Sequence, residues 1–380
     1  MKRSVYLDYA ASTPLEKNVL EKMTPHMLGN FGNADSLHSF GRKGMAAVDA
    51  SRDGIAELLG VRPDEIYFTS GGAEGDNWAV KGLARAAARQ GKKHIVLSAI
   101  EHHAVLDAAI ALGREGFSLS FVSANEGGMV EPNAVEKAMN ADTGLVCVMW
   151  ANNETGAIQP IKEISRLAKE KGATFFTDAV QAAPHLPIDL KEYKDVDAMA
   201  ISGHKFYGPK GVGALFLRRG VKAENLIDGG NQQRGKRGGT LNTPSIVGLY
   251  EALKQTRENL TETEAKLFAL RTTFLKELAS LSGWNVNGKN TLPAILNLRF
   301  DGVENGTLLR ELDLNGIAVS AGSACASGAI EPSRALLAMG LTNDQALSSV
   351  RVSFGKDTTE EDVIYAAEIL KKSVEKLHGK

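Results

Sequence analysis

Two stretches, TFFTDAVQ at residues 174–181 and AMAISGHKFYGPKG at residues 198–211, decide the fold class of this chain. Each opens with a short run that is apolar on both faces and then stops at small or polar residues. Strands buried between two layers of helices have this pattern, whereas strands with one wet face alternate in polarity. Residues 174–178 and 198–202 are therefore predicted to be strands of a mostly parallel sheet.

Runs of the same kind recur through the first two-thirds of the chain: Ile66 to Ser70, Ile95 to Ser98, Leu119 to Ser123, Leu145 to Trp150 and Val212 to Leu217. Segments with helical periodicity, such as residues 161–171, lie between most of them. This alternation predicts an α/β fold in which a mostly parallel, seven-stranded sheet lies between helices. In such sheets the active site lies at the carboxyl ends of the strands.

The pattern changes near residue 244. Residues 245–281 form a long, charged helical stretch without proline, which predicts a helix or a pair of helices leading into a second domain. Beyond it lie two more strand candidates, residues 294–299 and 350–354, and a final helix with a predicted capping box from Thr358 to Glu361. We expect a large domain of residues 14–250 and a smaller α+β domain of residues 1–13 and 251–380.

Charge and composition disfavour several classes of protein. The 380 residues include 44 Lys plus Arg and 45 Asp plus Glu. The net charge is therefore near zero and does not favour binding to nucleic acid or to an anionic membrane. Cys147 and Cys325 lie far apart and give no disulfide framework, which is typical of a reducing compartment. Apolar runs such as residues 145–151 are too short to span a bilayer, and no apolar run follows the basic first residues as in a signal peptide. We expect a cytoplasmic enzyme that binds neither nucleic acid nor membrane.

Three strand ends carry residues whose combination indicates one cofactor. The segment TSGGAEGDN at residues 69–77 can present backbone N–H groups to a phosphate, although a tight turn is the simpler interpretation of this segment alone. Asp178 is placed like a helix N-cap, but it can also pair with a protonated ring nitrogen. Lys205 would ordinarily be a surface lysine, yet burial behind an apolar strand can make its amine a nucleophile. With Ser202 and His204 as phosphate donors, the set predicts a site for pyridoxal phosphate (PLP).

Two further elements bear on the chemistry. The adjacent His102 and His103 point in different directions and make a poor metal pair, so we expect no metal. One of these imidazoles can instead lie over an aromatic ring and carry protons, or simply cap a helix. Cys325 lies in AGSACASG at residues 321–328, among small residues, so we expect the partly exposed loop that a reactive thiol requires. Cys147, within an apolar run, is predicted to be a core residue.

Taken together, these motifs resemble the NifS/IscS-type cysteine desulfurases, which are fold-type I PLP enzymes of the class V aminotransferase group. The resemblance runs nearly end to end and rests on residues 6–14 (YLDYAASTP), 71–77, 101–102, 152–156 (NNETG), 178–181, 202–205, 237–240 (RGGT), 322–327 and 349–351. The GSACAS motif on a long Gly/Ser-rich segment is similar to the NifS/IscS group. The SufS-like group has a shorter loop with a histidine-containing motif.

The resemblance implies a role for each matching residue. Lys205 would bind the PLP aldehyde, Asp178 would pair with the ring nitrogen, and His102 would stack on the ring and move protons. The remaining ligands would be Gly72, Ala73, Ser202 and His204 for the phosphate, Thr240 reaching the phosphate from a second subunit, Gln181 and Asn153 for the ring oxygen, and Asn153 and Arg351 for the substrate, with Arg351 on its carboxylate. Ala73 stands where relatives usually have Thr, so we expect one phosphate hydrogen bond, worth about 1–2 kcal/mol, to be missing.

The implied activity is the removal of sulfur from L-cysteine by a PLP-dependent homodimer. It would yield L-alanine and a persulfide on the catalytic Cys325, which passes sulfur to acceptors such as an iron–sulfur scaffold, a tRNA-thiolation protein or another thio-cofactor pathway. The alternatives are an aminotransferase or selenocysteine lyase that does not need Cys325, an inactive sulfur-carrier scaffold, and a nucleic-acid-binding protein that uses the basic residues of 229–240. The intact Lys205, Asp178 and Cys325 argue against the scaffold, and the lack of interleaved aromatic residues argues against the nucleic-acid binder.

Overall fold

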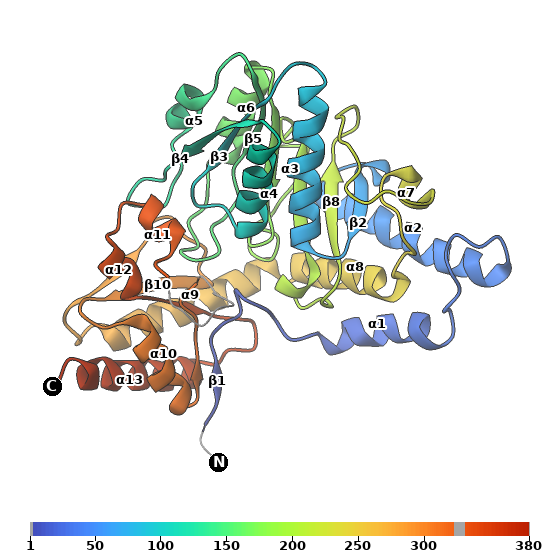
Figure 1. Ribbon diagram of the computed structural model, residues 1–380. Coiled ribbons are helices and arrows are strands. Elements are labelled where there is room, and N and C mark those ends of the chain that lie inside the picture. The colour runs from blue at the N-terminus through green and yellow to red at the C-terminus, as the bar shows by residue number, and fades with distance from the viewer. Residues whose placement is uncertain (1–2, 323–330, 380) are drawn as a thin grey trace.

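The computed structural model describes residues 3–322 and 331–379 and is centred on one large sheet (Figure 1). Its seven strands lie in the order β2-β8-β7-β6-β5-β3-β4. All neighbouring strands are parallel except those that pair with β8, which is antiparallel to β2 and to β7. The bounds are β2 (Ile66–Thr69), β3 (His94–Ser98), β4 (Ser118–Val122), β5 (Thr143–Cys147), β6 (Thr174–Asp178), β7 (Ala198–Ser202) and β8 (Gly213–Leu217). The predicted α/β fold is confirmed.

Side chains alternate between the two faces of this sheet and form two separate cores. On one face Leu97, Leu145 and Cys147 belong to a core shared with α3 (Gly72–Ala88) and α4 (His103–Arg114). On the other face Val96 and Val146 belong to a core shared with α2 (Ser39–Leu59), α6 (Ile161–Glu170) and α8 (Thr243–Glu258). Helices on both faces explain why most strands are apolar throughout. The run at 119–123 does form a strand, β4, but its expected burial on both faces was wrong, because this edge strand is mostly exposed or half-buried.

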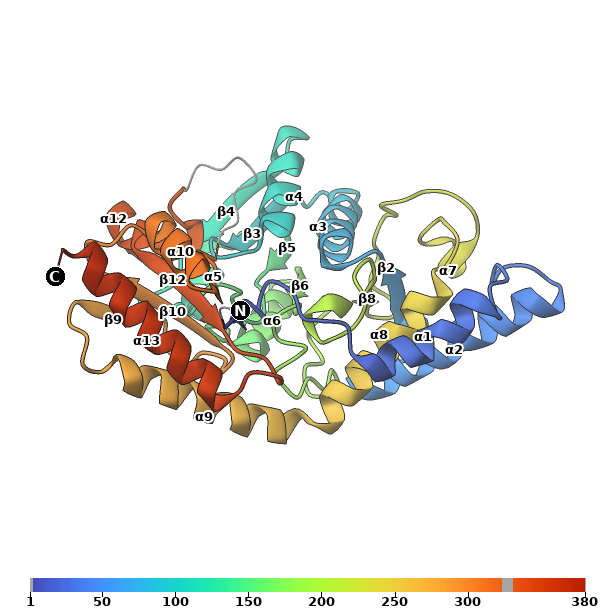
Figure 2. The same ribbon diagram turned by 90° about the horizontal axis from the view of Figure 1, so that it is seen from below.

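A second, three-stranded antiparallel sheet lies to the side of the first (Figure 2). Its order is β12-β10-β9, with β9 (Trp284–Asn287), β10 (Ile295–Phe300) and β12 (Ser349–Ser353). The helices α9 (Leu260–Leu278), α10 (Asn305–Leu314) and α13 (Glu360–Leu377) share the core of this sheet. The start of the chain joins this part, because β1 (Val5–Tyr6) runs parallel to β11 (Ile317–Ala318). The other helices are α1 (Lys17–Leu28), α5 (Pro132–Ala138), α7 (Gln232–Gly235), α11 (Arg334–Ala338) and α12 (Asn343–Leu347).

Local details refine the predictions. The stretch at 245–281 is a pair of helices, α8 and α9, that meet at Asn259. The capping box of the last helix lies one residue later than predicted: Asp362 N donates to Thr359 Oγ1 at 3.1 Å, whereas Thr358 Oγ1 accepts from Gly355 N in the preceding turn. The expected domain boundary at residue 250 would fall inside α8 and stays a prediction. Within residues 3–322 and 331–379, no helix combines the length and apolarity needed to cross a membrane.

Candidate active site

A cavity of about 420 Å³ lies where β6 and β7 end, and its walls include residues from both sheets. Of the predicted site residues that the structure describes, it brings together all except Thr240: Gly72, Ala73, His102, Asn153, Asp178, Gln181, Ser202, His204, Lys205 and Arg351. Asp178 and Ser202 are the last residues of their strands, so the position at the carboxyl edge of the sheet agrees with the prediction.

Lys205 lies in a short 3₁₀ turn, Gly203–Lys205, directly after β7. Its Nζ donates to the backbone oxygens of Ala10 (2.7 Å) and Ala11 (2.9 Å). Burial, and then the positive charge of Arg351, lowers the pKa of the Lys205 ammonium to about 8. A lysine with this pKa is partly a neutral amine near neutral pH, and only the neutral amine can attack an aldehyde.

Asp178 ends β6 and is buried, with one carboxylate oxygen accepting from Val180 N at 2.8 Å. Burial raises the pKa of this carboxyl, and His102 and Lys205 act in the opposite direction. A buried carboxylate of this kind is stabilised by a cationic donor. The protonated nitrogen of a pyridine ring is such a donor, so Asp178 fits the predicted role.

The turn before α3 has the geometry of an anion site. Gly71 adopts φ 152° and ψ −175°, a conformation that glycine tolerates and other residues rarely adopt. A Cβ on Gly72 would lie 2.8 Å from Val180 Cγ2, so glycine lets this helix end approach the end of β6 closely. No side chain in the described part of the chain caps the first turn of α3, which leaves its N–H groups for a ligand beside Ser202.

Two of the histidines that line the cavity, His102 and His204, have lowered pKa values, which favour the neutral imidazole. Ala104 N donates to Nδ1 of His102, the N-cap of α4, at 3.1 Å, so the neutral ring carries its hydrogen on Nε2. Burial lowers the pKa of His102. Burial, and then Lys205, lowers the pKa of His204 to about 4. His204 Nδ1 lies 3.3 Å from Ser12 Oγ. A neutral His102 can take up and release a proton.

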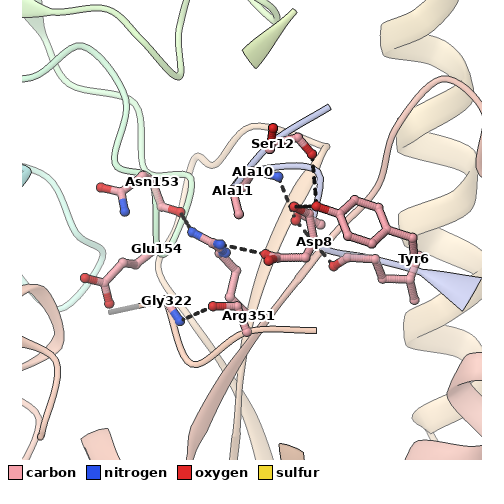
Figure 3. Close-up of polar contacts among 12 residues, drawn as sticks. Tyr6, Asp8, Ala10, Ala11, Ser12, Asn153, Glu154, Gly322 and Arg351 are labelled. Carbon is pink, nitrogen blue, oxygen red and sulfur yellow. Dashed lines mark hydrogen bonds and ion pairs between the residues drawn. The ribbon is translucent and has the colours of Figure 1, made fainter. Parts of the chain in front are cut away.

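Arg351, on β12, reaches the cavity from the second sheet and is held on two sides (Figure 3). Its Nη2 pairs with Asp8 Oδ1 at 2.7 Å, and its Nη1 donates to the backbone oxygen of Asn153 at 2.8 Å. Among the described residues, its buried Nε has no hydrogen-bond partner. Asp8 belongs to the segment YLDYAASTP that contributed to the resemblance, but no role was predicted for it from the sequence.

Sequence reasoning also gave no role to three buried carboxyl groups in this cavity, those of Asp76, Glu101 and Glu154. Glu101 accepts from Ser98 Oγ and, at 2.7 Å, from Met149 N, and burial raises its pKa to about 8. Burial, and then Asp178, raises the pKa of Asp76 well above its ordinary value. Glu101 is therefore mostly protonated at neutral pH, and burial favours the neutral form of Asp76. A helical repeat places Asp76 on the face of α3 that packs on the sheet, so its spacing to buried residues of that helix could have indicated burial.

One predicted residue, Thr240, does not line this cavity, and another, Cys325, belongs to a segment that the structure does not describe. Thr240 lies in a separate depression with Ser70 and Arg237. Cys325 lies outside the described residues, although described residues on both sides of that segment, Ser320, Gly322 and Glu331 among them, line the cavity. The residues that are present fit PLP: Lys205 for the aldehyde, Asp178 for the ring nitrogen and the Gly71 to Ala73 turn for the phosphate.

The chain is similar over nearly its whole length to one family and to relatives that share one name. The family described as aminotransferase class-V matches residues 5–365. A protein named cysteine desulfurase IscS from Clostridium botulinum (strain Hall) is 46% identical over 379 residues, which is 98% of this chain and 95% of the relative. The protein of the same name from Dictyoglomus turgidum is 44% identical over 380 residues, 99% of this chain and 96% of the relative.

Two solved structures extend the comparison to the fold. One described as a NifS-like protein superposes with a TM-score of 0.91 and 36% identity and covers 100% of both chains. A second, described as SspA in complex with cysteine, has a TM-score of 0.82 and 36% identity, over 92% of this chain and 99% of the other.

Proposed function

The chain belongs to the class-V aminotransferase family, and we propose that it acts as a PLP-dependent cysteine desulfurase. The relatives with that name match nearly the whole chain at 43–46% identity. The observation that carries the proposal is a single cavity that holds Lys205, Asp178 and Arg351 and whose walls include described residues flanking the segment that contains Cys325. L-Cysteine is the substrate, and L-alanine and a persulfide on Cys325 are the products.

Bound PLP supplies an aldehyde and a ring that withdraws electrons from the α-carbon of the substrate. Lys205 would hold the aldehyde and Asp178 the ring nitrogen, with His102 over the ring and Gln181 and Asn153 at the ring oxygen. The phosphate would bind to Gly72, Ala73, Ser202 and His204.

Side chains of the protein bind the substrate carboxylate, transfer the protons and attack the substrate sulfur. Arg351 binds the substrate carboxylate, and the Lys205 amine moves the proton of the α-carbon. His102 exchanges a proton at Nε2 with the reacting groups. The Cys325 thiolate attacks the sulfur of L-cysteine: an S–S bond forms, the C–S bond breaks, and its electron pair stays with the substrate carbon, which takes up a proton to become L-alanine.

The proposal includes a two-fold dimer in which Thr240 completes the phosphate site of the partner. Thr240 does not line the cavity of its own chain, which is consistent with a role elsewhere. Large apolar side chains are exposed around the connection between α1 and α2, at the right-hand end of the molecule in Figures 1 and 2: Met27, Leu28, Phe31, Leu37 and Phe40. Apolar surface of this kind marks a protein interface.

The proposed setting follows from the same chemistry. We place the enzyme in the cytoplasm, where Cys325 stays a thiol, and we propose that its persulfide is passed to sulfur-acceptor proteins such as an iron–sulfur scaffold. Residues 14–250 would form the PLP-binding domain, and residues 1–13 with 251–380 the smaller domain. The seven-stranded sheet within residues 66–217, the three-stranded sheet within residues 284–353 and the pairing of β1 with β11 support this division.

The test is to incubate the PLP-loaded protein with L-cysteine and to assay alanine and protein-bound persulfide together. The wild-type protein should give both. Cys325→Ser should still bind PLP but form almost no persulfide and release almost no sulfide. The matched control is Cys147→Ser, at a fully buried position in β5, which should change stability more than activity. Desulfuration by Cys325→Ser at the wild-type rate would contradict the proposal and favour a lyase or an aminotransferase.

A further inference from the structure

Asp8, near the start of the chain, forms an ion pair with the same guanidinium group, that of Arg351, that would bind the substrate carboxylate. The ion pair between Asp8 Oδ1 and Arg351 Nη2 is 2.7 Å long, and the two side chains are only 20% and 4% exposed. Both residues line the cavity at the proposed carboxylate site. Nη1 is occupied by the Asn153 backbone oxygen at 2.8 Å. One hydrogen on each terminal nitrogen of the guanidinium is thus already used before a substrate carboxylate arrives.

The backbone around Asp8 is fixed, so its carboxylate is held beside Arg351. Ser353 N, two residues after Arg351 on β12, donates to the Leu7 oxygen at 2.8 Å, and Ala10 N donates to Ser353 Oγ at 2.9 Å. The Tyr6 hydroxyl donates to the Asp8 oxygen at 3.0 Å. Figure 3 shows this segment and the Arg351 side chain converging on the Asp8 carboxylate. The backbone of Asp8 is therefore fixed beside β12, which places its carboxylate within reach of Arg351.

This arrangement has two opposite electrostatic consequences. A buried guanidinium without a counter-ion is costly, so Asp8 stabilises the folded protein when no other carboxylate is bound. The same negative charge lies next to the position of a second carboxylate and repels it. A residue that served only to hold the fold together would lack this second effect.

We propose that Asp8 is an internal counter-ion that positions Arg351 and limits how tightly the site binds the carboxylate of its amino-acid substrate. Asp8 thereby keeps the guanidinium stable and oriented but lowers its affinity for the substrate carboxylate. The lower affinity also makes release of the amino-acid product easier. The inference rests on the proposed function, because it takes Arg351 as the residue that binds the substrate carboxylate.

The test uses the PLP-loaded protein and its Asp8→Asn variant, which keeps an acceptor oxygen but loses the charge. The dissociation constant of L-alanine is measured by calorimetry, with L-alaninamide as a probe that lacks the carboxylate, and the midpoint of thermal unfolding is measured without either. Asp8→Asn should bind L-alanine about tenfold more tightly, leave L-alaninamide within about twofold, and unfold at a lower temperature. The matched control is Asp313→Asn, which removes an exposed carboxylate from α10 and should change none of these quantities.

Two further variants keep the test decisive. Asp8→Ser removes the charge with a smaller side chain and should also tighten L-alanine binding, which covers the case in which Asp8→Asn fails to fold. Asp8→Glu keeps the charge and should stay within about threefold of the wild type. Weaker or unchanged L-alanine binding in the variants that lose the charge would overturn the inference, provided that Arg351→Ala loses binding. Unchanged binding in Arg351→Ala would overturn both the inference and the proposed carboxylate role.

Discussion

Replacement of Gln233 by Ala should open one edge of the large sheet. Gln233 Oε1 accepts from Phe68 N, and Gln233 Nε2 donates to the Phe68 oxygen, each at 2.6 Å, so one side chain replaces a missing neighbour of the edge strand β2. Phe68 is 3% exposed. Leaving two such backbone groups unpaired costs about 1–3 kcal/mol each, less what water recovers at a sheet edge, and we expect a total of about 2–4 kcal/mol. The substitution does not relieve backbone strain at position 233, because Ala at φ 50° is as strained as Gln.

Hydrogen exchange followed by mass spectrometry measures this directly. A loss of about 2 kcal/mol corresponds to roughly 30-fold faster exchange, and a peptide covering residues 64–70 should show at least that change. Gln232→Ala is the matched control, because Gln232 accepts from Gly239 N at 3.2 Å and makes no contact of this kind with β2. Exchange within about threefold of the wild type in Gln233→Ala would refute the reasoning. Since the same loop carries Thr240, the variant should also lose PLP more readily on dialysis.

Three other predictions concern the cavity and the dimer. Because the pKa of Lys205 is lowered to about 8, uptake of PLP by cofactor-free protein, followed by absorbance, should accelerate as the pH rises through about 8; a flat profile would contradict the neutral-amine role. The folded-state pKa of Glu101 is raised to about 8 from an ordinary 4.5, so the folded protein binds the extra proton and its stability falls as the pH rises from about 4.5 to about 8. Glu101→Gln should therefore gain stability relative to the wild type across this window, and an equal pH dependence of unfolding in both proteins would argue against a protonated Glu101. Mixed dimers of Lys205→Ala and Thr240→Ala subunits should recover about one good site, whereas a fully active monomer in light scattering would rule out the shared site.

Features that depend on residues close together in the chain, such as the strands and the residues at their ends, could be predicted well from the sequence. Burial on both faces marks the strands, and the residues at strand ends, such as Asp178 and Lys205, follow from the strands. Local pattern does not reveal which distant residues meet. Asp8 and Arg351 are 343 residues apart, and only the pairing of the first segment with β11 and β12 brings them together. The resemblance supplied Arg351 as a ligand, but no pattern in residues 6–14 indicates the counter-ion.

The charges around the cavity also bear on why the proposed dimer would matter to the proposed function. In the proposed function Lys205 would face the aldehyde of PLP and Arg351 the carboxylate of the substrate, and Arg351 is already paired with Asp8. At the proposed phosphate position His204 is neutral, because its pKa is about 4, and Ala73 has no hydroxyl. A phosphate there would be held by dipoles: the N–H groups at the start of α3, Ser202 and one imidazole N–H. Hydrogen bonds to an anion each contribute about 1.5–3 kcal/mol, so with the Ala73 contact missing, a donor from Thr240 of the partner subunit would supply a substantial share of the phosphate affinity. A separated subunit would then lose PLP readily, which makes assembly a condition of catalysis.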